Sequence, residues 1–162
     1  VASFNTPVVN FSASSRRNRF YTIYNQTRML EQDVPYEYCI EALPKIMEKY
    51  KVYIISSRNK ELEAKTLEVM KRLGFPMDTM TIFFKKATEK LFNYQKKVMI
   101  QITQTFPTGI RLCLNLNEAS LATRYNYTPI AFTSIKNPED FNGATQVVCQ
   151  NWYEICSALN CT

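Results

Sequence analysis

Hydroxyl and guanidinium side chains follow two short apolar runs of this chain. Thr27 comes shortly after the run 20–24, while Ser56 and Arg58 stand at the end of the run 52–55. A hydroxyl and a guanidinium can hold a phosphate group through hydrogen bonds and charge. The same residues also have an ordinary structural use, because Thr and Ser cap helices and Arg forms surface ion pairs. We therefore treat them as candidate contacts for an anion and not as catalytic residues.

Carboxylates are scarce where the chain would need them for phosphoryl transfer or metal binding. The run 110–114 is followed by Asn115, and the carboxylate near it is Glu118. Magnesium is bound through carboxylates, and a single one brings little of the charge that the ion requires. The chain has no histidine and its five cysteines form no CxxC pair, which argues against zinc, haem and catalytic-triad sites. We expect no catalytic residue, no metal and no cofactor.

Short apolar runs alternate with amphipathic helical patterns along the chain. Five runs are rich in β-branched or aromatic residues, as buried parallel strands are: 20–24, 52–55, 81–84, 110–114 and 129–132. The helical pattern over 62–73 ends at Gly74, with Pro76 just beyond it. This order predicts an α/β fold, a Rossmannoid three-layer sandwich with a central parallel sheet of about five strands. Ligands of such sheets bind beyond the carboxyl ends of the strands, where Ser56 and Asn115 fall.

The order and spacing of these segments resembles the haloacid dehalogenase-like (HAD) phosphohydrolase superfamily, in particular its nucleotidase-like branch. The resemblance covers roughly residues 20–155, and the stretch 52–76 carries it best, with Ser56-Ser57-Arg58 near its start and Arg72-Leu73-Gly74-Phe75-Pro76 at its end. The segment Asn151-Trp152-Tyr153-Glu154-Ile155 matches a common ending of such chains. The resemblance implies a HAD-like α/β domain over residues 19–162. Since little sequence is inserted before residue 56 or after residue 75, the domain is expected to be essentially capless.

The resemblance also implies which positions have lost their chemistry. Family members carry DxDxT after the first strand, and the matching positions here are Ile23, Asn25 and Thr27. Isoleucine cannot attack phosphorus, and asparagine cannot transfer the proton that the second aspartate carries. The lysine of the third motif falls at Gln95, with Lys96 one residue away. The family's reaction therefore lacks both its nucleophile and its general acid/base.

The remaining motif positions lead to the expected function. The acidic pair of the fourth motif falls on Asn115 and Ala119, whereas Ser56 keeps the second motif with Arg58 close behind it. The resemblance thus implies that Thr27, Ser56 and Arg58 are vestigial phosphate-pocket positions. We expect a non-catalytic pseudoenzyme that acts as a structural or interaction subunit of a larger assembly, with other protein subunits as its partners. The alternative is a phosphate- or nucleic-acid-binding module that uses Ser56, Arg58 and the lysine pairs Lys85-Lys86 and Lys96-Lys97 as an anion site. An active phosphatase with shifted residues is a further, weaker alternative.

The charge and the N-terminal composition bear on partners and location. A net charge of +6 would suit an anionic partner, either nucleic acid or phospholipid. Residues 1–18 are expected to be a basic arm, since the first 30 residues include Arg16, Arg17, Arg19 and Arg28 but no Asp or Glu. This composition is typical of organellar transit segments and favours a mitochondrial location. We expect no membrane span, because no run approaches the ~20 apolar residues of a membrane helix. Four Asn-x-Ser/Thr sequons and five cysteines make secretion the alternative.

Overall fold

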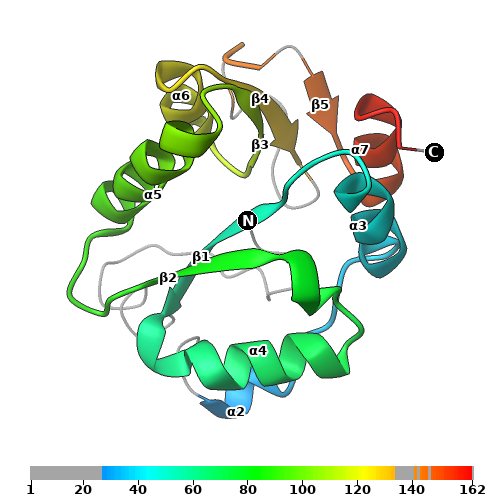
Figure 1. Ribbon diagram of the computed structural model, residues 1–162, viewed down its shortest axis with the longest axis vertical. Helices are drawn as coiled ribbons and strands as arrows, with labels where there is room; N and C mark the ends of the chain where they lie inside the picture. Colours follow the sequence, from blue (N-terminus) through cyan, green and yellow to red (C-terminus); the bar gives the residue numbers. More distant parts are fainter. Residues whose placement is uncertain (1–26, 134–140, 142, 146, 162) are drawn as a thin grey trace, which may run out of the picture.

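The computed structural model describes residues 27–133, 141, 143–145 and 147–161. The expected first strand, residues 20–24, and the expected basic arm, residues 1–18, lie outside these described residues. Figure 1 shows strands in the middle of the molecule with helices on either side of them. Within the described ranges, no helix is both long enough and apolar enough to cross a membrane.

In the described part of the chain, five strands form two parallel sheets. The first sheet pairs β1 with β2, and the second has the order β3, β4, β5. The strands are β1 (Tyr53–Asn59), β2 (Thr81–Lys85), β3 (Gly109–Cys113), β4 (Tyr127–Phe132) and β5 (Val147–Cys149). The helices are α2 (Thr27–Leu30), α3 (Cys39–Met47), η1 (Lys60–Leu62), α4 (Glu63–Arg72), η2 (Met77–Thr79), α5 (Leu91–Thr105), α6 (Leu116–Arg124) and α7 (Trp152–Ala158).

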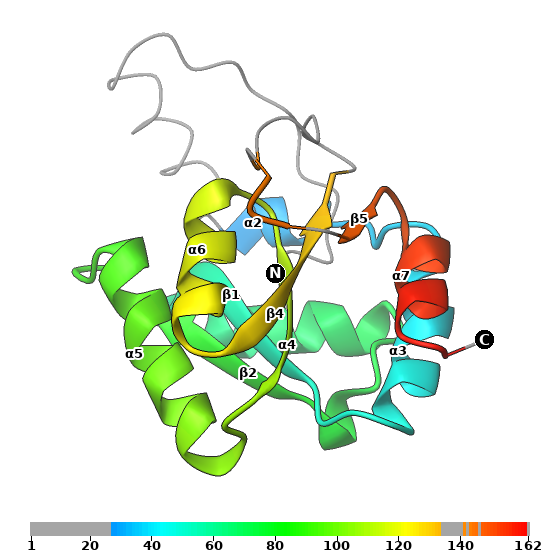
Figure 2. The same cartoon turned by 90° about the horizontal axis from the view of Figure 1, so that it is seen from above.

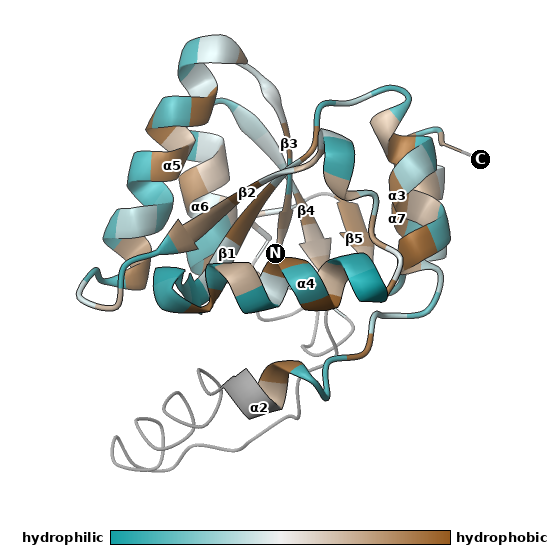
Figure 3. Cartoon of the chain, turned by 60° about the horizontal axis from the view of Figure 1, so that its bottom comes forward, coloured by the Kyte–Doolittle hydropathy of each residue, from teal (hydrophilic) through white to brown (hydrophobic). Residues whose placement is uncertain are grey.

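Alternate residues of the first sheet face two different layers of helices. On one side, Tyr53 and Ile55 of β1 pack against Val98 of α5. On the other side, Ile54 packs against the main core, to which α7 contributes Trp152. Figures 2 and 3 show α5 and α6 together on one side of the strands, and α3 and α7 together on the other. Strands buried on both faces need apolar residues at successive positions, which explains the unbroken apolar runs of the sequence.

The second sheet follows the same rule and shares its main core with the first sheet. Cys113 of β3 packs with Ala119 of α6 on one face. On the opposite face, Leu112 and Ile130 belong to the main core together with Ile82 of β2. Because one core lies against strands of both sheets, the two sheets occupy the same middle layer of the molecule.

The expected α/β architecture is confirmed, with parallel strands and helices on both faces. A single central sheet of about five strands is not shown, because the described strands divide into sheets of two and three. The expected strands 52–55, 81–84, 110–114 and 129–132 correspond to β1 to β4. The strand β5 was not expected, since a segment of three residues is too short to reveal a periodic pattern.

The helices that follow β3 and β5 begin with the same hydrogen-bonded arrangement. Asn115 and Asn151 have extended backbones, with φ of −156° and −153°, and precede α6 and α7. Their side chains accept hydrogen bonds from the amides of Glu118 and Glu154, each at 2.9 Å. Each glutamate in turn accepts a hydrogen bond from the amide of the residue before the asparagine. This reciprocal Asn-x-x-Glu cap satisfies amides that a helix leaves without partners at its N-terminus.

The cap of α7 can be tested without disturbing the sheets. We expect Asn151→Ala to lower the free energy of unfolding by about 1 kcal/mol, because the Glu154 amide loses its acceptor. Asn151→Asp keeps an acceptor oxygen and should stay close to the original stability. Urea denaturation followed by circular dichroism measures both variants. Equal stability of the Ala and Asp variants would show that the cap contributes nothing.

Candidate functional site

The expected first motif falls largely outside the described structure. Ile23 and Asn25 lie outside the described residues, and Thr27 is the first residue of α2. Leu30, at the end of α2, is fully buried and packs with Leu62, which lies just beyond the end of β1. The described chain therefore begins beside the carboxyl end of β1.

Ser56 and Arg58 lie within β1 and not after it, because the strand continues to Asn59. The Ser56 hydroxyl oxygen accepts a hydrogen bond from the Arg58 amide at 3.1 Å, so it is used locally. The Arg58 side chain is 3% exposed, and its Nη1 lies 2.5 Å from Oδ2 of Asp33. The guanidinium of the expected phosphate pocket is therefore already paired with a buried carboxylate.

Asp33 is a residue of this site that the sequence did not indicate. It lies in the link between α2 and α3, and its side chain is 7% exposed. A single acidic residue in a link forms no motif or periodic pattern that could have revealed it. Burying two charges costs several kcal/mol, and close pairing is what offsets this cost. The pair thus connects the link after α2 to the carboxyl end of β1.

Gln95 of α5 and Glu118 of α6 meet near the carboxyl end of β3. Gln95 Nε2 donates a hydrogen bond to Glu118 Oε2 at 3.1 Å. Glu118 Oε1 accepts a second hydrogen bond from the Leu114 amide at 2.8 Å. Both side chains belong to buried residues. The structure therefore brings the regions of the expected third and fourth motifs together through Gln95.

Arg111 adds a buried charge beside Glu118. It lies in the middle of β3, is 6% exposed, and places its Nη2 3.8 Å from Glu118 Oε2. Its Nε and Nη1 are buried without a hydrogen-bond partner among the described residues. The sequence could have indicated this buried charge, because Arg111 is a charged residue inside the apolar run 110–114. The Glu118 carboxylate is thus surrounded by an amide, a carboxamide and a guanidinium of the protein itself.

Asn115 and Ala119 do not assemble a set of metal ligands with their neighbours. The Asn115 side chain caps α6, and Ala119 is fully buried with only a methyl group to offer. Burial raises the pKa of the nearby Cys113 thiol to about 12, while Arg111 acts in the opposite direction. This thiol therefore stays protonated near neutral pH and is not a thiolate ligand or nucleophile. The part of the chain that the structure describes contains no group of three His, Cys, Asp or Glu residues placed to hold a metal ion.

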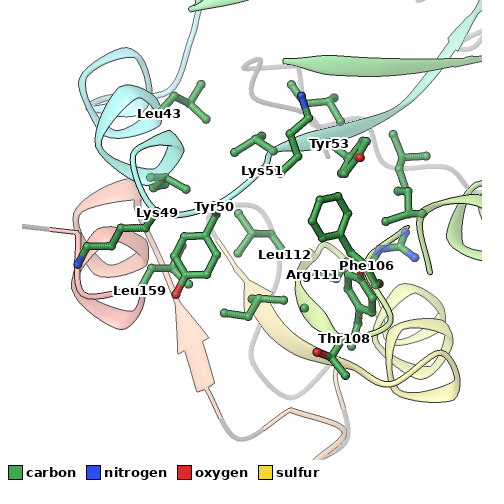
Figure 4. Close-up of a pocket in the computed structure, with 18 of the residues that line it drawn as sticks. Leu43, Lys49, Tyr50, Lys51, Tyr53, Phe106, Thr108, Arg111, Leu112 and Leu159 are labelled. Carbon is green, nitrogen blue, oxygen red and sulfur yellow. The ribbon is translucent and has the colours of Figure 1, made fainter. Parts of the chain in front are cut away.

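A cavity of about 330 Å³ lies between the two sheets. Its lining comes from β1, β3, β4, α3, α5 and α7 and the segments beside them, and is mostly apolar. Figure 4 shows Leu43, Tyr53, Phe106 and Leu112 around this space. The expected site residues that the structure describes, such as Ser56, are not among the lining residues. The cavity and the expected phosphate pocket are therefore different parts of the molecule.

Comparison with known proteins relates the chain to others through its fold. No protein-family model and no curated protein sequence matches it. A solved structure, the crystal structure of a dehalogenase with an intermediate complex, superimposes with a TM-score of 0.59 at 15% sequence identity. The match covers 92% of this chain and 64% of that chain, so the present chain spans somewhat less than two thirds of its length. This similarity supports a HAD-like fold and concerns the fold alone.

The contribution of the buried Asp33–Arg58 ion pair to stability can be compared with that of the exposed ion pairs nearby. Asp33→Asn leaves the Arg58 guanidinium buried beside a neutral amide, and we expect a loss of about 3 kcal/mol in the free energy of unfolding. Glu31→Gln is the matched control, because Glu31 is exposed and pairs with Lys65 and Arg72 at the surface. We expect little change from this variant, since water screens exposed pairs. Urea denaturation at pH 7 gives both values, and similar losses in the two variants would refute the special role of Asp33.

Proposed function

We propose that this chain is a non-catalytic HAD-like protein, a pseudoenzyme that serves as a structural or interaction subunit of a larger mitochondrial assembly. Other protein subunits are its partners in this proposal. The proposal also includes four structural points. The catalytic motifs are lost, the chain is related to the nucleotidase-like branch, and the site is essentially capless. The two described sheets are parts of a single central sheet.

The environment of Glu118 is the observation that carries this proposal. Its carboxylate accepts hydrogen bonds from Gln95 and from the Leu114 amide, and lies near the Arg111 guanidinium. A magnesium ion bound there would lie beside the buried Arg111 guanidinium, and the single Glu118 carboxylate would have to offset the charge of both cations. The geometry thus supports a structural use of the carboxylate that lies nearest the expected metal site.

A stacked pair of tyrosines supports the interaction role. The Tyr38 and Tyr153 rings are nearly parallel at 9°, with centroids 4.0 Å apart, and Tyr153 is 50% exposed. The Tyr38 hydroxyl accepts a hydrogen bond from Lys45 at 2.9 Å. Tyr38 has a φ of 64°, a left-handed conformation that costs a residue with a side chain about 1–2 kcal/mol. Exposed aromatic rings held in one position are typical of protein interfaces.

The alternative function is a phosphate- or nucleic-acid-binding module. Arg58, the cation expected to bind the phosphate, is already paired with Asp33. A phosphate at Arg58 would have to displace the Asp33 carboxylate, which lies 2.5 Å from the guanidinium. Exposed lysines such as Lys86 and Lys90, in the loop before α5, remain open to an anion. Binding through such lysines would weaken steeply with added salt. A steep salt dependence of nucleic-acid binding would therefore favour this alternative.

The cysteines bear on the proposed location. All five are buried free thiols, the form that a reducing compartment maintains. This state is more typical of proteins in a reducing compartment than of secreted proteins. The alternative of secretion then depends on the four sequons alone.

We expect no hydrolysis of a generic phosphomonoester such as p-nitrophenyl phosphate, with or without magnesium, above the rate of a heat-denatured sample. The expectation follows from the engaged Glu118 carboxylate and from the substitutions at the motif positions. Glu154→Gln serves as a matched control for Glu118→Gln, because Glu154 makes the same capping contacts at α7. A magnesium-dependent rate that Glu118→Gln abolishes and Glu154→Gln retains would reverse the proposal.

Deletion of residues 1–18 tests the interaction role of the basic arm. We expect an almost unchanged melting temperature together with reduced co-purification of native partners. The physical reason is that Arg16 and Arg17 have no acidic residue within the arm to neutralise them, so they need carboxylates or phosphates from elsewhere. A large fall in melting temperature with association intact would show that the arm belongs to the folded domain.

A further inference from the structure

Three large apolar side chains of α5 are exposed to solvent. Leu91 is 40% exposed, Phe92 48% and Ile100 41%. Phe92 and Ile100 belong to one row of the helix surface, about two turns or about 12 Å apart. The helix is anchored through its other side, where Tyr94 and Val98 form a core cluster with residues of β1 and β2. The exposed apolar side chains are therefore held in place by the fold itself and do not depend on a partner for their position.

Lysines surround these apolar side chains. The stretch 85–97 contains five lysines and one acidic residue, Glu89. Glu89 pairs with Lys97 at 3.2 Å. In the part of the chain that the structure describes, Lys86, Lys90 and Lys96 form no ion pair. Lys96 also lies in the same row of α5 as the apolar side chains. The surface at the start of α5 is thus apolar and positively charged at the same time.

The loop before α5 is held in shape by Lys85. Its Nζ donates hydrogen bonds to the carbonyl oxygens of Lys86 and Glu89, each at 2.9 Å. The Glu89 amide donates a further hydrogen bond to the Lys86 carbonyl oxygen at 3.1 Å. Figures 1 and 2 show this loop and the start of α5 as the outermost part of one side of the described fold. A broad, flat partner can therefore reach this surface without meeting the other described elements first.

We propose that the start of α5 and the loop before it dock on a lipid bilayer that contains anionic phospholipids. Leu91 and Phe92 enter the boundary between the headgroups and the acyl chains, and Lys86, Lys90 and Lys96 lie among the phosphates. Phe and Leu beside lysines are the composition of surfaces that lie on a bilayer. Lysine suits this place because its apolar stem lies along the acyl chains while its ammonium stays at the headgroups. The proposal goes beyond the proposed function and holds whether or not the chain is a pseudoenzyme.

Two other kinds of partner match this surface only in part. A nucleic acid would place phosphates at the lysines and could stack a base on Phe92, but the aliphatic Leu91 and Ile100 would remain in water. The centre of a protein interface is depleted of lysine, whereas Lys96 lies between Phe92 and Ile100. A bilayer with anionic headgroups accommodates the charges and the aliphatic side chains together.

The charged part of the surface is tested by co-sedimentation of the full chain with lipid vesicles. We expect the chain to bind vesicles of phosphatidylcholine and phosphatidylserine, and to bind vesicles of phosphatidylcholine alone far more weakly. Lys90→Gln combined with Lys96→Gln should weaken binding about twentyfold, since each lysine near an anionic surface contributes a factor of about five. Lys60→Gln combined with Lys71→Gln is the matched control, because it removes two exposed lysines from η1 and α4 and should leave binding nearly unchanged.

The apolar part of the surface is tested by the fluorescence of Phe92→Trp. The single natural tryptophan, Trp152, is 4% exposed and lies in the main core, so its emission should not respond to lipid. We expect the emission of Phe92→Trp to shift to shorter wavelength when phosphatidylserine vesicles are added, because the new indole leaves water. Val34→Trp is the matched control, since Val34 is 56% exposed in the link between α2 and α3, and it should show no shift.

Several results would overturn the proposal. They are equal binding to neutral and anionic vesicles, equal losses from the two pairs of lysine substitutions, and the absence of a shift in Phe92→Trp. A chain that binds a short DNA duplex but no vesicle would replace the bilayer by a nucleic acid, and a chain that binds neither would leave this surface without either partner. The assay for phosphomonoester hydrolysis is independent of all these outcomes, so failure of this proposal is distinguishable from failure of the proposed function.

Discussion

Burial of the strands on both faces is the constraint that shapes this molecule. Each strand must meet helices on two sides, and the size of its side chains sets how closely they approach. Where α6 packs on β3 and β4, the residues in contact are small, namely Cys113, Ala119, Ala122 and Ala131, and the ring of Phe141 completes this cluster. On the opposite face, large rings fill the space, as Phe132 and Trp152 do with centroids 5.9 Å apart. The two helical layers thus use side chains of different size, and both bury one face of the strands.

Charges in such an interior need partners, and two arginines of the strands show how they are provided. Arg58 in β1 pairs with Asp33 at 2.5 Å, and Arg111 in β3 lies 3.8 Å from Glu118. Both acidic partners come from outside the sheets, one from a link and one from a helix. The buried charges therefore connect the surrounding segments to the strands. This use differs from the phosphate and metal chemistry that the motif order implies for the same region.

The sequence predicted β1 to β4 because strands buried on both faces produce unbroken apolar runs that are easy to recognise. It did not predict that β1 continues through Ser56 to Asn59, since polar residues at a strand end resemble a loop. The Asn-x-x-Glu pattern at Asn115 was present and could have shown that Glu118 closes a helix cap. Asp33 carried no such signal, because its role depends on a contact across the fold. The hydrogen bond between Gln95 and Glu118 could not be predicted either, because spacing along the chain does not reveal a contact between two helices.

The five buried thiols have a consequence for how this protein can be followed over time. Cys39 and Cys113 are fully buried, Cys149 and Cys156 nearly so, and Cys161 is 3% exposed. Alkylating reagents attack the thiolate, and burial raises the pKa of Cys113, Cys149 and Cys156. Labelling of each thiol must therefore await an opening of the segment that covers it. The cysteines act as built-in reporters of local opening, with Cys113 under α6 and the other four in the main core beside α3 and α7.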